Sequence, residues 1–239
     1  LTISETPLKA EGSSVYLAAN EAYLNGAYEK AKTILATAKI DADADALNLI
    51  AVMHQYGRGV PKNEAEAIRL YRQAAQLGSV KAKRNLGHTY AYGRGVAKND
   101  AEAVRWYRLA ADQGNATAQH NLGVMYADGS GVPKNDAEAA RLYRLAADQG
   151  NASAQFNLGL SYQDGRGVPQ NDVQAVRWYR LAADQGNASA QVNLGRMYAH
   201  GRGVVRNDAE AVRLYRLAAA QGNLTARKNL NFMYENGRV

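Results

Sequence analysis

The sequence predicts an all-α fold, a right-handed α-solenoid of stacked helical hairpins with a period of 36 residues. An Asn-Leu pair returns at that interval, with its asparagine at Asn85, Asn121, Asn157, Asn193 and Asn229. Glycines and tyrosines keep the same step, at Gly57, Gly93, Gly129, Gly165 and Gly201 and at Tyr71, Tyr107, Tyr143, Tyr179 and Tyr215. A regular period of this length is typical of repeat proteins, in which each unit packs on its neighbours.

The repeat divides the chain into four parts. Residues 1–12 are an N-terminal tail, and residues 13–44 are a capping hairpin and linker that depart from the repeat. Five full units follow, at 45–80, 81–116, 117–152, 153–188 and 189–224. Residues 225–239 begin a sixth unit and end after its first half.

Each unit is expected to begin with an amphipathic helix, here called helix A. In the third unit Ala118, Leu122 and Tyr126 are spaced by four, which predicts this helix over residues 116–128. The segment GSGVPKN then ends it, because glycine adopts positive φ readily and proline has no amide hydrogen.

A second helix, helix B, is expected to complete the unit. We expect Asp136 to be its N-cap and Gly150 to supply the left-handed residue at its end. Its apolar face is expected to carry Ala137, Ala140, Tyr143 and Ala147. Because one hairpin is too small to bury this face alone, stability must come from stacking.

A glycine stands in the middle of helix A in four units, at Gly87, Gly123, Gly159 and Gly195. Glycine inside a helix costs ~1 kcal/mol relative to alanine, so we expect a close contact with helix B to require it. The half unit, which has no helix B, carries Asn231 at this position, and the first unit carries the small Ala51.

The pattern AxxNLGxxYxxGxGVxxNxxEAxRxYRxAAxxGN runs from Ala118 to Asn151 and recurs in the other units. It resembles the Sel-one-like repeat family, which is related to the tetratricopeptide repeats. The resemblance implies a solenoid that binds protein partners and has no catalytic residues to carry over. The stretch 13–40 is instead similar to one tetratricopeptide unit, with Gly26, Tyr28, Ala31 and Ala38 in matching positions, and is expected to cap the first repeat.

Composition excludes several classes of protein. The absence of cysteine excludes disulfide scaffolds, cysteine-ligated metal sites and thiol nucleophiles. The longest apolar run, 49–53, is far shorter than the ~20 residues that cross a bilayer, so we expect no membrane insertion. The net charge of +7 is only mildly basic.

The sequence predicts no metal ion, no cofactor and no catalytic site. Its four histidines, His54, His88, His120 and His200, show no metal-binding spacing. The aspartates Asp41, Asp43 and Asp45 begin like a calcium loop, but the turn glycine and the closing glutamate are missing, so a linker is expected.

Two alternative functions stay open. Some cysteine-rich bacterial members of the resembled family bind or hydrolyse penicillin-type compounds, but this chain has no cysteine and no SxxK, SDN or KTG motif. Two arginine ladders suggest nucleic-acid binding, at Arg105, Arg141, Arg177 and Arg213 and at Arg108, Arg144, Arg180 and Arg216. Acidic residues three before the first ladder and four after the second predict intrahelical ion pairs instead, at Glu102, Glu138, Glu210, Asp112, Asp148 and Asp184.

Three positions of helix A differ from unit to unit, and their spacing of four places them on one face. The first reads Arg84, His120, Phe156, Val192 and Lys228; the second reads His88, Val124, Leu160, Arg196 and Phe232; the third includes Tyr92, Asp128, Asp164 and His200. Positions that the scaffold does not hold constant often line the concave surface of a solenoid. We expect them to form a binding surface with an apolar centre and a basic rim, drift among exposed positions being the alternative.

The sequence therefore predicts a non-catalytic module that binds a protein partner through a concave helix A face. It acts as an adaptor or scaffold, or as a stoichiometric inhibitor of a partner enzyme, an immunity-type role that the family resemblance permits in bacteria. The partner is expected to present acidic groups to Arg84, Arg196 and Lys228, and the oligomeric state is left open. The chain opens at Leu1 and the location is left open; a leader removed before Leu1 would favour a periplasmic or secreted protein.

The half unit raises one structural question. Its helix A carries Leu230, Met233 and Tyr234, and no following helix is available to cover them. Terminal repeats normally have a polar outer face, so we expect either a partner or fraying at this end.

Overall fold

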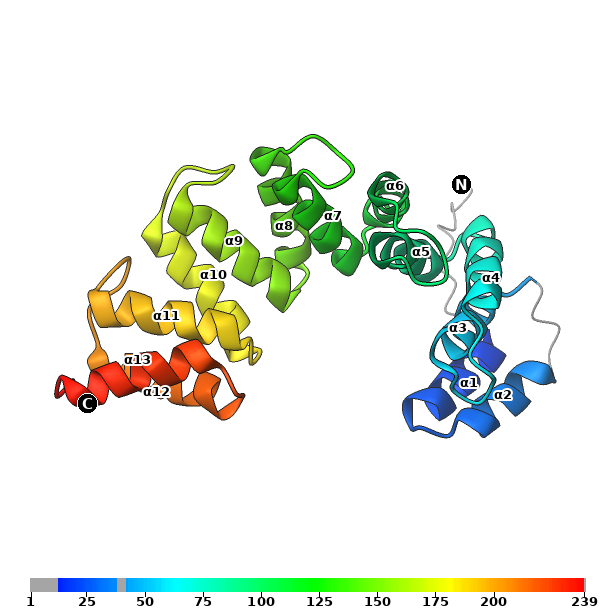
Figure 1. Ribbon diagram of the computed structural model, residues 1–239, viewed down its shortest axis with the longest axis horizontal. Helices are drawn as coiled ribbons and strands as arrows, with labels where there is room; N and C mark the ends of the chain where they lie inside the picture. The colour runs from blue at the N-terminus through cyan, green and yellow to red at the C-terminus, as the bar shows by residue number, and fades with distance from the viewer. Residues whose placement is uncertain (1–12, 38–41, 239) are drawn as a thin grey trace, which may run out of the picture. The chain divides into compact units, whose positions relative to one another are not determined.

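The computed structural model describes residues 13–37 and 42–238, and these form thirteen helices and no strand (Figure 1). The chain divides into two compact units, the first ending at Gln113 and the second beginning at Gly114. The first holds α1 (Ser14–Leu24), α2 (Tyr28–Ala36), α3 (Ala44–Tyr56), α4 (Glu64–Gln76), α5 (Val80–Tyr92) and α6 (Asp100–Ala111). The second holds α7 (Ala116–Asp128), α8 (Asp136–Asp148), α9 (Ala152–Asp164), α10 (Asp172–Asp184), α11 (Ala188–His200), α12 (Asp208–Ala220) and α13 (Leu224–Glu235).

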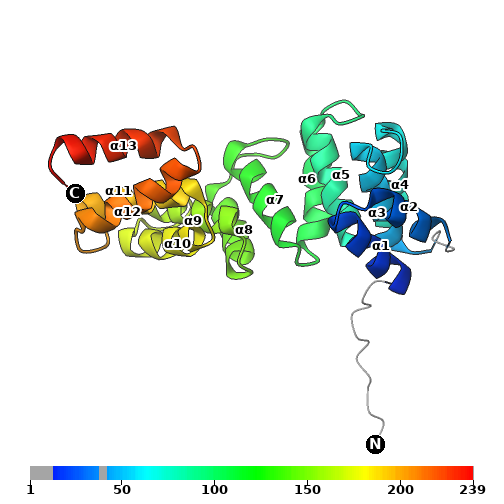
Figure 2. The same cartoon turned by 90° about the horizontal axis from the view of Figure 1, so that it is seen from below.

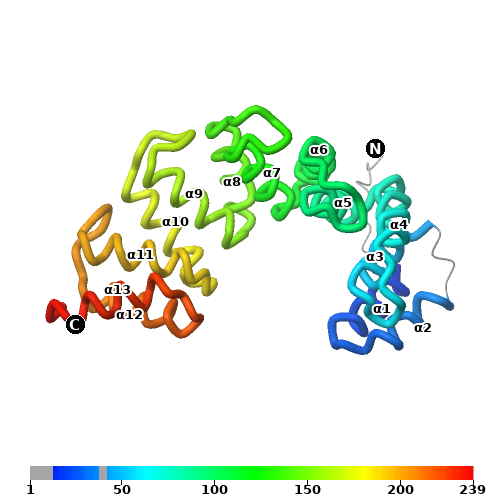
Figure 3. Tube along the Cα trace, in the orientation of Figure 1, coloured from blue at the N-terminus to red at the C-terminus, as the bar shows by residue number. Residues whose placement is uncertain are grey.

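Helical hairpins repeat along the chain, as the tube in Figure 3 shows. The odd-numbered helices from α3 to α13 are the predicted helix A, and the even-numbered helices from α4 to α12 are helix B. Within each compact unit every helix A packs on the helix B that follows it, and that helix B packs on the next helix A. In the first unit α1 and α2 pack on each other and on α3. The all-α solenoid with a 36-residue repeat is confirmed.

Asparagine side chains begin both helices of the hairpin. The Asn151 carboxamide oxygen accepts a hydrogen bond from the Ala154 amide at 2.9 Å at the start of a helix A. Helix B in the third unit begins in the same way, with Asn135 accepting from the Glu138 amide at 3.0 Å. The expectation that Asp136 caps this helix is therefore wrong by one residue. Asn135 has the extended backbone that a cap needs, while Asp136 lies in the first turn, where its charge favours the helix dipole.

Glycines end the helices. Each complete helix A from α3 to α11 closes on a left-handed glycine, such as Gly129 at φ 74°. Helix α8 has Gln149 as its C-cap, and Gly150 follows with φ 86°. Positive φ is strained for residues with a Cβ, so these positions define where each helix stops.

The apolar face of helix B differs from the prediction at one residue. In α8 the buried residues are Ala139, Ala140, Leu142, Tyr143, Ala146 and Ala147. Ala137 is exposed, because at 100° per residue it lies well away from the centre of that stripe.

The last helix, α13, covers part of its own apolar surface against α12 (Figure 2). Met233 is only 1% exposed and packs with Ala199, Val212 and Tyr215. The expectation that Met233 lacks a cover is therefore wrong, because the preceding hairpin buries the inner side of the helix. Leu230 is half-buried, while Tyr234 remains 44% exposed.

Candidate partner-binding face

The glycine in the middle of helix A lies close to helix B, as predicted, and the residue that it contacts is the repeated tyrosine. A Cβ added at Gly159 would stand 2.6 Å from ring carbons of Tyr179. The same contact, at 2.5–2.7 Å, recurs between Gly87 and Tyr107, Gly123 and Tyr143, and Gly195 and Tyr215. In α13, the last helix of the described residues, the equivalent Asn231 is exposed. This contact fixes the spacing between the two helices of each hairpin.

The first variable position of helix A is not free of structural duty. His120 and Phe156 pack on Tyr143 and Tyr179, with 6.0 Å between ring centroids in each pair. Val192 is only 5% exposed and packs with Ala218 and Ala226. Because these side chains support the hairpin, their variation does not by itself mark a binding residue.

The asparagine that recurs in helix A contacts this first position in the preceding helix A. Asn85 Nδ2 donates to Asn48 Oδ1 at 2.8 Å, and Asn157 Nδ2 lies 3.1 Å from His120 Nε2. The first of these pairs links α3 to α5, and the second links α7 to α9. Polar residues at this position therefore help to join successive repeats.

The predicted apolar centre is smaller and less exposed than expected. Phe156 and Leu160 are half-buried and pack against a core cluster that contains Tyr179 and Met197. With Val192 buried as well, Val124 and Leu160 contribute only partly exposed apolar surface. Phe156 and Leu160 are therefore not an exposed apolar pair.

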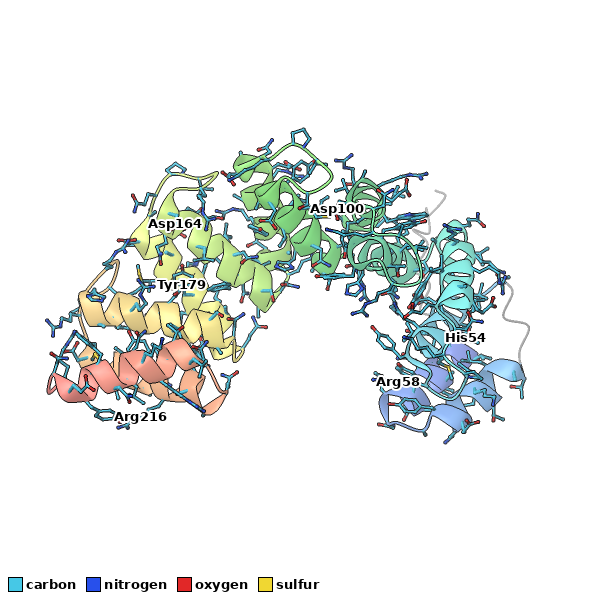
Figure 4. The ribbon with its side chains drawn as sticks, in the orientation of Figure 1. His54, Arg58, Asp100, Asp164, Tyr179 and Arg216 are labelled. Carbon is cyan, nitrogen blue, oxygen red and sulfur yellow. The ribbon has the colours of Figure 1, made fainter. Side chains whose placement is uncertain are left out.

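The remaining variable residues are the exposed part of the face. Arg196 and Lys228 are exposed, and Phe232 is 53% exposed. At the third position Tyr92, Asp128, Asp164 and His200 are exposed, and Asp164 lies at the end of α9 (Figure 4). On α5, in the first compact unit, Arg84 and His88 are half-buried. The His88 ring packs on Tyr92 with 4.5 Å between centroids.

A pocket of about 220 Å³ opens on this face in the second compact unit, where α7, α8 and α9 meet. Val124, Asp128 and Leu160 line it, together with Tyr143. In two other repeats the equivalent tyrosine donates a hydrogen bond to a glutamine of helix A, Tyr71 to Gln55 at 2.8 Å and Tyr179 to Gln163 at 3.0 Å. The repeat of Tyr143 has Ala127 in place of that glutamine. Burial, and after it the nearby charge of Asp128, raise the pKa of Tyr143, so its hydroxyl stays protonated.

Burial favours the neutral form of two histidines on this face, His120 and His88. Burial lowers the pKa of His120 below its ordinary value, against the opposing effect of a hydrogen bond with Asn121. Burial also lowers the pKa of His88, and the charges of Arg94 and Arg84 add to that effect. Neutral imidazoles can donate and accept hydrogen bonds in a partner interface.

A second pocket, of about 380 Å³, lies in the first compact unit among α1, α3 and α5. Lys81 and Arg84 line it, with Asn48 and two tyrosines of α1, Tyr16 and Tyr23. Comparison of the repeats could not have found it, because α1 lies outside the repeat. The only sequence signal is Arg84, which the variable pattern includes.

The two arginine ladders behave differently. The first is paired as predicted, with ion pairs of 2.7 Å between Arg141 and Glu138 and between Arg213 and Glu210, and one of 3.6 Å between Arg105 and Glu102. The second reaches the next helix A instead: Arg180 and Arg216 each donate to a tyrosine hydroxyl eighteen residues on, at 2.7 Å.

The expected pairings of Arg144 with Asp148 and of Arg180 with Asp184 are therefore wrong. Arg144 donates to Tyr162 in the same way, and no ion pair to Asp148 or Asp184 forms within the described part of the chain. The reason is geometric, since these guanidiniums lie at the junction with the following repeat. Their engagement with tyrosines weakens the case for a nucleic-acid stripe.

Two remaining sequence expectations concern metals and membranes. Within residues 13–37 and 42–238, no three His, Cys, Asp or Glu side chains gather closely enough to hold a metal ion. Asp43 caps α3 through the amides of Asp45 and Ala46, while Asp41 lies outside the described residues. None of the described helices is long and apolar enough to span a bilayer.

Comparison with known proteins places this architecture. The family model described as the Sel1 repeat matches residues 44–79, 80–115, 116–151, 152–187 and 188–223. A Sel1 repeat protein from Oxalobacter formigenes is 38% identical, with a TM-score of 0.85, over 94% of this chain and 90% of that one. No curated protein matches the sequence.

Two further structures are similar. The protective antigen c5321 of uropathogenic Escherichia coli is 34% identical with a TM-score of 0.83, over 91% of this chain, which spans 48% of that protein. The immunity protein Pa5087 from Pseudomonas aeruginosa is 22% identical with a TM-score of 0.56, over 87% of this chain and 82% of that one, and shares the fold alone. On the repeated motif, the hairpin geometry and these matches, the chain belongs to the Sel1 repeat family.

Proposed function

We propose that this chain binds a protein partner through the exposed positions of helix A, as an adaptor or as a stoichiometric inhibitor of a partner enzyme. Sel1 repeats are protein-interaction modules. The observation that carries the proposal is the combination of Arg196, Lys228 and Phe232 on α11 and α13. These three residues vary between repeats and are exposed.

The residue types support a protein partner. Arginine and aromatic side chains carry much of the binding energy in protein interfaces, and Arg196 and Phe232 occupy the same position of two successive helix A segments. The exposed helix A residues of the second compact unit carry charges of both signs, with Asp128 on α7 and Lys228 on α13. Such a distribution orients a partner and selects against others.

The test is affinity capture from the source cell's extract with a variant of the exposed positions. The double variant Arg196→Glu, Phe232→Ser changes one charge and one apolar side chain without disturbing a buried residue. A matched control, Arg177→Glu, Leu181→Ser, makes the same kinds of change on α10, where Leu181 is 40% exposed. Circular dichroism should show equal helicity for all three proteins.

We expect one protein to be retained in stoichiometric amount by the native chain and by the control, and to be lost with the helix A variant. Equal retention by all three proteins, or loss with the control alone, would place the binding surface elsewhere. Capture of no protein would contradict the proposal. With the purified partner, a fall in its enzymatic activity on addition of this chain would identify the inhibitor role.

A further inference from the structure

The pocket of the first compact unit differs in charge from the pocket lined by Asp128, because its lining is basic. It lies on the helix A side of α1, α3 and α5, and its lining contains Lys81 and Arg84 but no carboxylate. Comparison of the repeats selects only Arg84 in this pocket, because one wall belongs to the capping hairpin.

The two cations in the pocket are in different states. Lys81 is already engaged, since its Nζ lies 3.2 Å from the Asp45 carboxylate and donates to the Tyr16 hydroxyl at 2.7 Å. Arg84 is not: its Nε is buried without a hydrogen-bond partner, and no ion pair joins its guanidinium to any carboxylate of the described residues. A buried donor without a partner costs free energy, and a guanidinium that lines a pocket without an ion pair favours an acceptor from a ligand.

Further basic residues surround the pocket and fix its aromatic walls. Arg58 donates to the Tyr23 hydroxyl at 2.9 Å and lies 5.6 Å from the Tyr23 ring and 5.4 Å from the Tyr56 ring; Figure 4 shows it beside α1. Arg94 donates to the Tyr56 hydroxyl at 3.4 Å. These guanidiniums hold the phenols in place and add positive potential, so the pocket attracts an anion before contact.

Amides supply additional donors. Asn85 donates one hydrogen to Asn48 at 2.8 Å, and Asn20 of α1 lines the opposite wall. Each carboxamide has two N–H donors, so the Asn48–Asn85 pair uses only part of its capacity. The pocket therefore combines an unpaired guanidinium with neutral donors, which suits a carboxylate.

The remaining wall is apolar. Leu49 and Val52 of α3 line the pocket between the polar groups, and Leu24 stands at its rim, 74% exposed. Because Arg84 lines the pocket together with these apolar side chains, a carboxylate on a thin apolar stem suits it best. A glutamate side chain has such a stem, and its two methylenes would contact Leu49 and Val52.

We propose that this pocket binds a glutamate side chain on the surface of the protein partner, with the carboxylate paired to Arg84. The inference rests on the proposed function and names the chemistry of one contact. The pocket is larger than one side chain, so the flanking backbone of the partner enters as well. The contact is an arginine anchor of the kind that dominates interface energy.

The test uses the full chain and a minimal probe, N-acetyl-glutamate N-methylamide, followed by NMR of the asparagine side-chain amides. We expect saturable shifts at Asn20, Asn48 and Asn85 with this probe and none with the isosteric N-acetyl-glutamine N-methylamide. N-acetyl-glycine, which carries a main-chain carboxylate, and inorganic phosphate test the other anion sources.

Two variants and a control examine the role of Arg84. Arg84→Gln is expected to weaken binding of the glutamate probe by about 10-fold or more, as loss of a charge-assisted hydrogen bond implies. Arg84→Lys keeps the charge without the planar pair of donors, so its affinity for the glutamate probe should lie between those of the native chain and Arg84→Gln. The control Arg196→Gln removes an exposed arginine from α11 and should leave the probe affinity unchanged.

The proposal is overturned if the glutamine probe shifts the same amides, if acetyl-glycine or phosphate binds as tightly as the glutamate probe, or if Arg84→Gln binds normally. Absence of any shift at 20 mM probe, a concentration suited to an affinity of about 10 mM, also overturns it. Partner capture that depends on Arg196 and Phe232 but not on Arg84 would leave the proposed function standing while this contact fails.

Discussion

At the scale of single residues, the contact between helix A glycine and helix B tyrosine sets how closely each hairpin packs. Tyr179 is fully buried, and its ring occupies the space that a Cβ at Gly159 would take. Burial raises the pKa of these tyrosines, for Tyr215 to about 12, so their hydroxyls remain neutral donors at physiological pH. The glycine is therefore required by packing, although it is unfavourable for the helix itself.

The substitution Gly159→Ala tests this balance. Alanine improves helix propensity by ~1 kcal/mol, but its Cβ would stand 2.6 Å from Tyr179 ring carbons, and overpacking of this kind costs ~1–3 kcal/mol. We expect a net loss of stability in urea denaturation. The matched change Asn231→Ala, at the exposed position of α13, should leave stability equal or higher. Stabilisation by Gly159→Ala would contradict the close contact.

A second prediction concerns His120 and pH. The folded chain lowers the pKa of His120 through burial, so the unfolded chain takes up the proton more readily as pH falls. Its contribution to stability should be fully present above the ordinary histidine pKa of ~6.5 and decline below it, when protonation of Nε2 disrupts the contact with Asn157. His120→Gln should remove this part of the pH dependence between about pH 7 and 5. Thermal melts across that range measure it, with the exposed His200→Gln as control.

At the scale of elements, neighbouring hairpins are joined by both apolar and polar contacts. Leu158 of α9 is fully buried. It packs with Tyr143 and Ala146 of α8 in the preceding repeat and with Trp178 of α10 in the same repeat. The Arg180 guanidinium donates to Tyr198 on the following α11. Because the exposed arginine contact contributes only ~0–1 kcal/mol, the apolar contact dominates the stability of the stack.

Leu158→Ala measures that apolar contact. Removal of a fully buried leucine side chain typically costs ~2–5 kcal/mol, through lost transfer energy and the cavity left behind. Leu181→Ala, in the same repeat but 40% exposed, should cost less than ~1 kcal/mol. Chemical denaturation of both variants gives the comparison, and equal losses would mean that Leu158 does not carry the stacking.

At the scale of the whole molecule, stability is built from contacts between neighbouring elements. Each compact unit has its own core clusters, and the clusters within it follow the order of the repeats. In such arrays stability is approximately a sum of repeat terms and nearest-neighbour interface terms. Damage to one repeat should therefore remain local.

Hydrogen exchange tests this locality with the Leu158→Ala variant. Amides of α8, α9 and α10 should exchange faster than in the native chain, because their shared cluster is weakened. Amides of α3 and α4, which belong to a different compact unit, should change far less. A uniform loss of protection along the chain would show that the molecule unfolds as one cooperative body.

The period, the helices and their turns could all be predicted from the sequence. The expected helix A over residues 116–128 coincides with α7, and the glycine positions mark the helix ends. These features depend on residues within one unit, through apolar spacing, capping side chains and the freedom of glycine to adopt positive φ. The repeated motif was also sufficient to indicate the family.

The surface required the tertiary structure. Variation between repeats selected Phe156 and Val192 as binding residues, yet one is half-buried on Tyr179 and the other is buried. In the pocket beside Arg84 it selected Arg84 alone and not the wall that comes from α1. Local sequence patterns by themselves determined the helices and turns of each hairpin. Packing between hairpins decided which side chains are accessible, because burial depends on residues that are a whole repeat apart in the sequence.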